Sequence, residues 1–272
     1  MKRRRADVAL YDDMNLESMA LAKALIMEGR VMAGDRKINN ASEWVKEGEV
    51  LRVRGELDKY VSRGAHKLKK AVDVFKLDLA GKTCVDVGCS TGGFTDVMLR
   101  AGAKHVYCVD VGYNLLDYKL RSDPRVTALE RTNARFLTPD HFPVAPEFGA
   151  TDVSFISLKA VLPAVLPLLS GNREFVALIK PQFEAAKEDV GEKGVVTDRN
   201  VHFAVLKDIL DFIPSTGWAA AGLDFSPVRG PEGNIEFLLH LLPKEEVQVN
   251  INESTINDII SAAYDNFLKF AR

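Results

Sequence analysis

The chain contains 272 residues, of which 47% are hydrophobic, and its formal net charge is −2. This length is enough for one large domain with a full-sized core and a second, small one. Because no run of about 18 apolar residues occurs, a membrane span is not expected. The basic start, MKRRRADVALYDDMN, has no apolar segment of a secretory signal, so the sequence predicts a cytoplasmic protein without a membrane partner.

The positive charge is concentrated in the first part of the chain. Residues 1–76 contain 17 Lys and Arg against 12 Asp and Glu, whereas the remaining residues contain 19 against 26. A basic segment on an acidic body is typical of a polyanion-binding arm, so nucleic acid is a candidate partner. A solvated surface would show the same imbalance.

The cysteines and histidines do not predict a metal site. Cys84, Cys89 and Cys108 lie in or beside apolar runs without CxxC spacing, so they are expected to be small buried residues rather than disulfides or zinc ligands. The five histidines are His66, His105, His141, His202 and His240. They are scattered without metal-ligand spacing, and no metal is assigned.

The first predicted elements form a small α+β unit. Apolar residues recur at helical spacing from Leu16, and Gly29 predicts the end of that helix. Gly34 and Asp35 predict a turn, and the alternation in VLRVRG predicts a strand. We therefore expect a separate domain over residues 1–58, followed by a second domain over residues 59–272.

The second domain predicts a parallel α/β sheet, because strand-like and helix-like segments alternate from Lys82 onward. A helix is expected to begin near Gly64. Strands are predicted at Thr83–Val87, His105–Asp110, Val126–Glu130, Gly149–Val153 and Phe175–Lys180, and helices at Gly93–Ala101, Leu158–Leu169 and Val201–Ile213.

The last third of the chain predicts an antiparallel hairpin and a terminal helix. The strand-like runs WAAAGLDF and NIEFLLHLL are joined only by SPVRGPEG, which is too short for a crossover helix. The terminal helix is amphipathic and should pack on the domain through Ile256, Ile259, Ile260, Ala263 and Phe267.

The stretch VDVGCSTGGFTD, residues 85–96, predicts a nucleotide-type ligand. Gly88, Gly92 and Gly93 follow a strand and open a helix, so a ligand can approach the backbone closely. Asp110 ends the next strand, where a carboxylate can bind a ribose diol. These features fit a dinucleotide or an adenosyl cofactor, and a tight turn without a ligand is the alternative.

S-adenosylmethionine is favoured over a dinucleotide for two reasons. Asp86 lies two residues before the first glycine, where it suits the charged groups of the methionine end, and a terminal antiparallel hairpin differs from an all-parallel sheet. Asn133 follows the third strand, where its amide can meet the adenine edge. The expected cofactor-binding residues are Asp86, Gly88, Ser90, Thr91, Gly92, Gly93, Phe94, Asp110 and Asn133.

Six motifs in this order resemble the TlyA or hemolysin-A-like family, which belongs with the FtsJ-like ribose methyltransferases. They are YVSRGAHKL (60–68), VDVGCSTGGFTD (85–96), ERTNAR (130–135), TDVSFISL (151–158), LIKPQFEA (178–185) and VRGPEGNIEFL (228–238). The resemblance spans nearly the whole chain. It implies a Rossmann-like class I methyltransferase sheet and S-adenosylmethionine-dependent methyl transfer to a ribose 2'-hydroxyl of ribosomal RNA, with cytidine as the target.

The resemblance also implies an RNA-binding N-terminal domain of a ribosomal-protein type, with AKALIMEGRV (22–31) as its central helix and turn. The family signature S-R-E is replaced here by Ser18-Met19-Ala20, and the signature V-N-G is replaced by Met32-Ala33-Gly34. These replacements bear on the usual RNA contacts and not on the fold. The expected partner is ribosomal RNA or a ribosomal subunit. The residues expected to bind it are Arg3, Arg4, Arg5, Arg30, Lys37 and Arg63.

The family uses a Lys-Asp-Lys-Glu tetrad, which the resemblance places on Lys67, Asp152, Lys180 and Glu236. Asp152 and Lys180 fall at the ends of predicted parallel strands, and Glu236 falls in the last hairpin strand. A lysine with a pKa of about 10.4 is protonated at neutral pH and acts as a base only when burial or another cation lowers that pKa. We hypothesise that Lys180 is the base or the oxyanion stabiliser.

Each tetrad residue also has a structural explanation. Lys67 could belong to a solvated helix face, Lys180 could end a strand, Asp152 could cap a turn and Glu236 could lie on an exposed strand face. Residues 185–202, rich in glycine and charge, have the composition of a mobile flap or of a plain surface loop.

Two other functions remain open. The first is an RNA-binding protein without catalysis. The second is membrane lysis, which the terminal helix disfavours because its polar face carries Asn257, Asp258, Asp265 and Asn266 rather than a basic stripe.

Overall fold

The computed structural model describes residues 3–14, 16, 19–54, 60–230, 232–247 and 251–269. The chain divides into two compact units, Met1–Lys59 and Tyr60–Arg272. The predicted boundary between residues 58 and 59 lies outside the described residues, so it stays a prediction.

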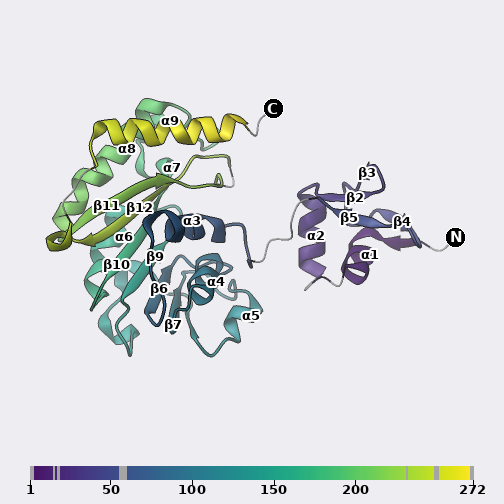
Figure 1. The fold of residues 1–272 in the computed structure, drawn as a ribbon, viewed down its shortest axis with the longest axis horizontal. Coiled ribbons are helices and arrows are strands. Elements are labelled where there is room, and N and C mark those ends of the chain that lie inside the picture. The colour runs from purple at the N-terminus through teal and green to yellow at the C-terminus, as the bar shows by residue number, and fades with distance from the viewer. Residues whose placement is uncertain are drawn as a thin grey trace. The chain divides into compact units, whose positions relative to one another are not determined.

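The first unit combines two helices with two small antiparallel sheets in its described part (Figure 1). The helices are α1 (Ala6–Asp13) and α2 (Met19–Met27); the strands are β1 (Arg3–Arg5), β2 (Val31–Ala33), β3 (Arg36–Lys37), β4 (Trp44–Lys46) and β5 (Leu51–Val53). Strand β1 pairs with β4, and the other sheet has the order β3-β2-β5. The predicted helix, its end near Gly29 (φ 69°), the turn at 34–35 and the strand at 51–53 are confirmed.

Helix α1 was not predicted, because Asp7, Asp12 and Asp13 interrupt the apolar pattern of its sequence. Asp7 is nevertheless only 2% exposed. Its carboxylate accepts hydrogen bonds from Arg5 Nε (3.0 Å) and from the Val8 backbone N–H (2.9 Å). The hydrogen bonds from Arg5 lower the pKa of Asp7 despite its burial. A local ion pair therefore places a carboxylate where the pattern requires an apolar residue.

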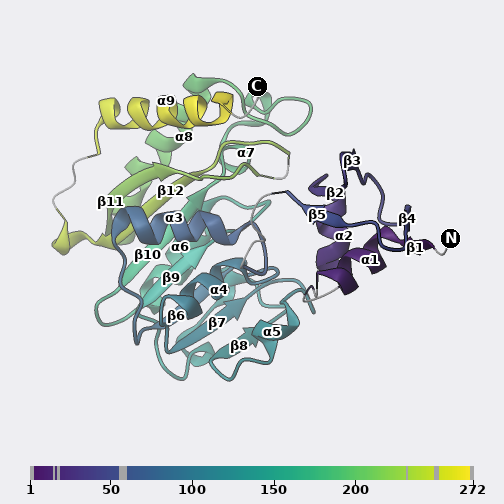
Figure 2. The same ribbon diagram turned by 45° about the vertical axis from the view of Figure 1, so that its right-hand side comes forward.

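The second unit contains a seven-stranded sheet with the order β11-β12-β10-β9-β6-β7-β8, whose succession can be followed in Figure 2. The strands are β6 (Thr83–Val87), β7 (His105–Val109), β8 (Val126–Leu129), β9 (Phe148–Thr151), β10 (Glu174–Ile179), β11 (Trp218–Phe225) and β12 (Phe237–Pro243). Strands β6 to β10 are parallel, and β12 is antiparallel to both β10 and β11. The predicted α/β class and the terminal hairpin are confirmed.

Helices cover both faces of this sheet. They are α3 (Ala65–Phe75), α4 (Gly93–Arg100), α5 (Tyr118–Arg121), α6 (Leu158–Val165), α7 (Pro181–Glu184), α8 (Arg199–Phe212) and α9 (Glu253–Lys269), with short 3-10 turns at Ala134–Phe136, Pro139–His141, Leu166–Leu168, Lys187–Asp189, Ile213–Thr216 and Lys244–Glu246. Phe175 and Ala177 of β10 pack in the core beneath α6, α8 and α9, whereas Val176 packs in the core beneath α3 and α4. This alternation explains why β10 is hydrophobic at every position after Glu174.

The terminal helix and the cysteines lie as the sequence predicted. Ile256, Ile260 and Ala263 of α9 are buried, and α9 runs beside α8 (Figures 1 and 2). All three cysteines are buried thiols without a disulfide. In the described part of the chain, no helix is both long and apolar enough to cross a membrane, and no three His, Cys, Asp or Glu side chains form a group that could hold a metal ion.

Candidate active site

The glycine loop follows β6 and leads into α4 at the carboxyl end of the sheet. Gly88 and Gly92 have φ angles of 83° and 95°, and Ser90 joins them in the left-handed region at 47°. A Cβ on Gly88 would lie 2.8 Å from the backbone oxygen of Asp152, so no other residue fits there without moving the backbone at the end of β9. The loop therefore lies directly against the backbone that follows β9.

Asp110, immediately after β7, fixes the position of this loop. Its Oδ2 accepts a hydrogen bond from the Ser90 backbone N–H (2.8 Å), and its Oδ1 accepts one from the Gly112 N–H (2.7 Å). Each carboxylate oxygen has a further lone pair, so Asp110 can also accept a hydrogen bond from a ligand hydroxyl.

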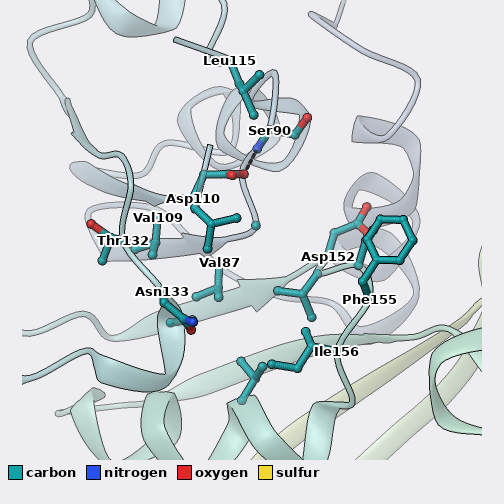
Figure 3. Close-up of a pocket in the computed structure, with 16 residues that line it drawn as sticks. Val87, Ser90, Val109, Asp110, Leu115, Thr132, Asn133, Asp152, Phe155 and Ile156 are labelled. Atoms are coloured by element: carbon teal, nitrogen blue, oxygen red, sulfur yellow. Dashed lines mark hydrogen bonds between the residues drawn. The ribbon is translucent and has the colours of Figure 1, made fainter. Parts of the chain in front are cut away.

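A cavity of about 410 Å³ opens between these strand ends. Figure 3 shows Asp110 and Asn133 on one side of it and Asp152 and Phe155 on the other. Asn133 Oδ1 accepts a hydrogen bond from the Arg135 backbone N–H (3.0 Å), which leaves the amide NH₂ as a donor. With apolar walls and a few polar groups, the cavity has the character of a nucleoside site.

A second cavity of about 210 Å³ adjoins the first and shares Gly88, Ser90, Asp152 and Ser154 with it. Asp86 lines it and is fully buried. Asp86 Oδ2 accepts hydrogen bonds from the Thr95 N–H (2.9 Å) and hydroxyl (2.7 Å), whereas Oδ1 has no partner among the described residues. Burial raises the pKa of Asp86 to about 7 against the opposing effect of the Thr95 hydrogen bonds. A carboxylate in this position suits a cationic ligand group.

Eight of the nine predicted cofactor-binding residues line one of these two cavities. Gly92 lines neither, because it lies beneath Leu116 and Leu120, and a Cβ there would come within 2.3 Å of Leu120. Its part is to let the chain turn into α4. Ser62 and Gly64, which line the second cavity from just before α3, were not predicted. No signal short of tertiary proximity links these two residues to the glycine loop.

The structure brings the four tetrad side chains together beside the second cavity. Lys67 Nζ lies 2.7 Å from Glu236 Oε2 and 3.0 Å from Asp152 Oδ2. Lys180 Nζ lies 2.5 Å from the other oxygen of Asp152 and donates a hydrogen bond to Ser154 Oγ (3.0 Å). Asp152 therefore lies between the Nζ atoms of the two lysines, and the site contains two basic and two acidic side chains.

These charges are held away from water. Lys67 and Lys180 are each 7% exposed, and Glu236 is fully buried. Burial opposes the charge on Lys67, but Asp152 and Glu236 outweigh it and raise the pKa of Lys67. Burial likewise disfavours the charge on Asp152, yet the two lysines lower its pKa, whereas burial raises the pKa of Glu236. Lys67 is consequently stabilised as an ammonium ion.

Two of the structural alternatives are wrong. Lys67 is not on a solvated helix face; it is buried, and Lys69 of the same helix is the exposed lysine, paired with Asp73. Glu236 is not on an exposed strand face, and it is not in the strand at all, because β12 begins at Phe237. The Glu236 side chain turns inward toward Lys67, against Gly230, where a Cβ would lie 2.7 Å from Oε1.

Phe155 lies at the edge of the larger cavity and was not singled out by the sequence. It is 91% exposed and has a φ of 63°, which is strained for a bulky residue. Its ring centroid is 5.1 Å from that of Phe183. An exposed ring beside a reaction site is suited to stacking on a nucleobase.

The segment predicted as a flap is attached to the hairpin loop through Asn234. Asn234 Oδ1 accepts a hydrogen bond from the Val196 N–H (2.9 Å), and its Nδ2 donates to the Gly194 carbonyl (2.8 Å). Val196 is 2% exposed. That residues 185–202 move over the site stays a prediction.

The predicted RNA-binding residues are distributed over both units. Arg3 is exposed, whereas Arg4 pairs with Asp13 and Arg5 pairs with Asp7. Arg30 Nε donates to the Arg54 carbonyl (3.0 Å), and the Lys37 side chain lies over Gly29. In the second unit, Arg63 donates to the Arg229 carbonyl (3.2 Å). Their part in RNA binding stays a prediction.

The fold and the paired cavities define an α/β enzyme that binds a nucleoside-containing cofactor at the carboxyl ends of its strands. The pattern of the FtsJ-like methyltransferase family matches residues 60–242, and the chain belongs to this family. It is accordingly an S-adenosylmethionine-dependent methyltransferase.

Relatives match over almost the whole chain. The 16S/23S rRNA (cytidine-2'-O)-methyltransferase TlyA of Mycobacterium tuberculosis is 41% identical over 241 residues, which cover 88% of this chain and 90% of that protein. Hemolysin A of Brachyspira hyodysenteriae is 37% identical over 239 residues, covering 88% and 99%. The solved structure of a candidate hemolysin from Streptococcus thermophilus is 41% identical and superposes with a TM-score of 0.80, covering 100% of this chain and 99% of its own.

Proposed function

We propose that this protein transfers a methyl group from S-adenosylmethionine to the ribose 2'-hydroxyl of a cytidine in ribosomal RNA, acting on ribosomal subunits in the cytoplasm. The observation that carries the proposal is the buried cluster of Lys67, Asp152, Lys180 and Glu236 beside the two adjoining cavities. The 41% identical relative from M. tuberculosis has this activity in its name, which supports the choice of substrate.

The residues present fit the cofactor. We assign the larger cavity to the adenosine, with Asp110 accepting from the ribose and the Asn133 amide facing the adenine edge. The unpartnered Oδ1 of Asp86 would accept from the amino group of the methionine end. When bound, S-adenosylmethionine supplies an electrophilic methyl group on a sulfonium centre.

The tetrad would position the hydroxyl and receive its proton. Alcohol oxygens are poor nucleophiles, so holding the 2'-oxygen in line with the methyl group supplies much of the acceleration. Lys67 cannot accept the proton, because Asp152 and Glu236 stabilise it as an ammonium ion. Lys180, which Asp152 and Ser154 orient, is therefore the residue we assign to receive the proton or to stabilise the developing oxyanion.

The proposal is tested by methyl transfer to ribosomal subunits from a strain that lacks this gene. Purified protein and S-adenosylmethionine with a labelled methyl group are added to small subunits, large subunits and the deproteinised rRNA of each. The RNA is then hydrolysed with alkali. A labelled, hydrolysis-resistant dinucleotide is expected, because a methylated 2'-oxygen cannot attack the neighbouring phosphate.

Each other outcome has a definite meaning. Label in mononucleotides would indicate methylation of a base rather than of the ribose. Absence of transfer together with binding of S-adenosylhomocysteine would indicate a different acceptor, and absence of both would favour an RNA-binding protein without catalysis. Leakage of dye from phospholipid vesicles at the same protein concentration would instead favour membrane lysis.

A further inference from the structure

The two-stranded sheet of the N-terminal unit presents one basic and aromatic face. Strands β1 and β4 pair antiparallel, with Arg3 opposite Lys46 and Arg5 opposite Trp44. These four residues are all exposed, whereas Val45, on the other face of β4, is fully buried. Because side chains alternate along a strand, all four project from the same side of the sheet. We call them the β1–β4 face.

The charges on this face are not arranged for stability. Arg3 and Lys46 lie directly opposite each other, and like charges in that position destabilise a sheet. The nearby acidic groups already have basic partners: Asp7 pairs with Arg5, Asp13 pairs with Arg4, and Glu43 pairs with Arg36. Glu49, which accepts a hydrogen bond from the Lys46 backbone N–H (3.0 Å), pairs with Arg36 at 3.5 Å. Within the described part of the chain, neither Arg3 nor Lys46 forms an ion pair. An anionic ligand would remove the repulsion between them.

Trp44 is placed for binding rather than for packing. It is 60% exposed, whereas Trp218, the other tryptophan, is 3% exposed in the core of the second unit. Across the described residues, Trp44 has no aromatic or cation–π partner that would hold its ring against the protein. A large aromatic ring left in water between arginine and lysine side chains is the arrangement that binds unpaired nucleotides, with the base on the ring and the phosphates on the cations.

We propose that the β1–β4 face binds a single-stranded or looped segment of RNA, with an unpaired base stacked on Trp44 and the flanking phosphates on Arg3 and Lys46. This inference rests on the proposed function only in that it takes RNA as the partner. It adds a stacking residue and a phosphate contact to the expected RNA-binding residues. Charge complementarity favours RNA over self-pairing of this face, since two copies of the face would repel each other.

The test measures binding of the full-length protein to two fluorescein-labelled probes, a single-stranded 16-nucleotide RNA of mixed sequence and its duplex. Trp44→Ala should weaken binding to the single strand about tenfold or more and change duplex binding less than twofold, because only an unpaired base can stack. Trp44→Phe should retain most of the affinity. Val50→Ala, which truncates another exposed apolar residue of the same unit, should have no effect.

Lys46→Gln tests the phosphate contact separately. It should make the negative slope of log affinity against log salt shallower by about 0.7 for the single-stranded probe, as loss of one phosphate contact does. Single-stranded RNA should also quench the tryptophan fluorescence of the wild type and not that of Trp44→Phe, because Trp218 is buried.

The inference is overturned when Trp44→Ala binds the single strand as well as the wild type, or when Trp44→Phe loses as much affinity as Trp44→Ala. It is equally overturned when Trp44→Ala changes the sedimentation of the free protein from a dimer to a monomer, which would make the face a protein interface. The assay measures only the affinity for the two RNA probes and not methyl transfer. A protein that binds the probes but does not methylate rRNA would therefore contradict the proposed function and leave this inference standing.

Discussion

The surface ion pairs of the N-terminal unit and the buried tetrad of the methyltransferase unit hold their charges in opposite environments. In the N-terminal unit, pairs such as Arg36 with Glu43 lie at the surface, where both side chains keep contact with water. In the methyltransferase unit, Lys67, Asp152 and Glu236 are withdrawn from water and compensate one another. Surface pairs of the first kind contribute about 0–1 kcal/mol, whereas removal of one partner from a buried group costs about 3–5 kcal/mol.

This difference in exposure corresponds to what polyanion binding and proton transfer each require of charged side chains. A surface that binds a polyanion needs exposed positive charge that can replace the counterions of the phosphates. The exact geometry of the individual side chains adds little. A site that moves a proton needs groups with fixed positions and fixed protonation states, which only a buried network supplies. Under the proposed function, the same residue types would serve for attraction in one unit and for orientation in the other.

The largest effect is expected at Lys180. Lys180→Ala should lower kcat about 10³-fold, because it removes the group that receives the proton or stabilises the oxyanion, and it should leave S-adenosylmethionine binding within about threefold. Single-turnover methyl transfer and isothermal titration measure the two quantities. Lys180→Arg places a permanent positive charge there that cannot accept a proton, so recovery of activity in that variant would reject the role of base in favour of charge stabilisation.

The control for Lys180 is Lys159→Ala, since Lys159 is a lysine of the same unit that pairs with Asp208 near the surface. It should retain wild-type turnover. Turnover by Lys180→Ala at a rate comparable with this control would remove Lys180 from the mechanism.

The next effect tests the buried network through stability. Lys67→Met should lower the free energy of unfolding of the methyltransferase unit by about 3 kcal/mol, because Glu236 and Asp152 lose their shared cation. Denaturant unfolding followed by the fluorescence of the buried Trp218 reports on this unit.

Two matched variants separate burial from charge. Lys69→Met, two residues along the same helix, and Arg36→Gln in the N-terminal unit both break exposed pairs and should each cost less than about 1 kcal/mol. Equal losses for Lys67→Met and Lys69→Met would mean that the burial of the tetrad contributes nothing to stability.

A further effect concerns Asp86 and depends on pH. Burial raises the pKa of Asp86 to about 7 from an ordinary value of 3.8. The folded protein therefore holds this proton more tightly than the unfolded chain, and the resulting stabilisation is complete below about pH 4 and lost as the pH rises through about 7. Asp86→Asn should flatten this part of the stability curve of the cofactor-free protein, measured by thermal unfolding between pH 4 and 8.

Cofactor affinity should change in the opposite direction. Ionised Asp86 attracts the cationic end of S-adenosylmethionine, so affinity should increase as the pH rises through about 7, and Asp86→Asn should weaken binding about tenfold and remove that dependence. Thr95→Val, which removes the hydroxyl that donates to Asp86 Oδ2, should weaken binding less because Oδ1 is unaffected. An affinity that is independent of pH in the wild type would exclude Asp86 from cofactor binding.

Particular strands and helices show which elements the sequence patterns predicted correctly. The strand β6 and the edge strand β11 were predicted to the residue, because apolar runs between turn residues encode burial locally. Helix α1 was missed because a contact with Arg5 buries Asp7, and a periodicity analysis counts every aspartate as exposed. Glu236 was placed in a strand because it alternates with apolar neighbours, whereas the chain folds inward there and the ladder begins one residue later.

The sequence by itself determined the parallel α/β order, the glycine loop, the carboxylate after the second strand of the sheet and, through resemblance, the four tetrad positions. These depend on spacing within short segments, which backbone geometry translates directly into strands, turns and helix starts. Only the tertiary structure decided that β12 lies between β10 and β11, that Ser62 adjoins the glycine loop, and that Lys67 is buried between Asp152 and Glu236. Those facts depend on contacts between residues far apart in the chain, whose burial and charge compensation no local pattern records.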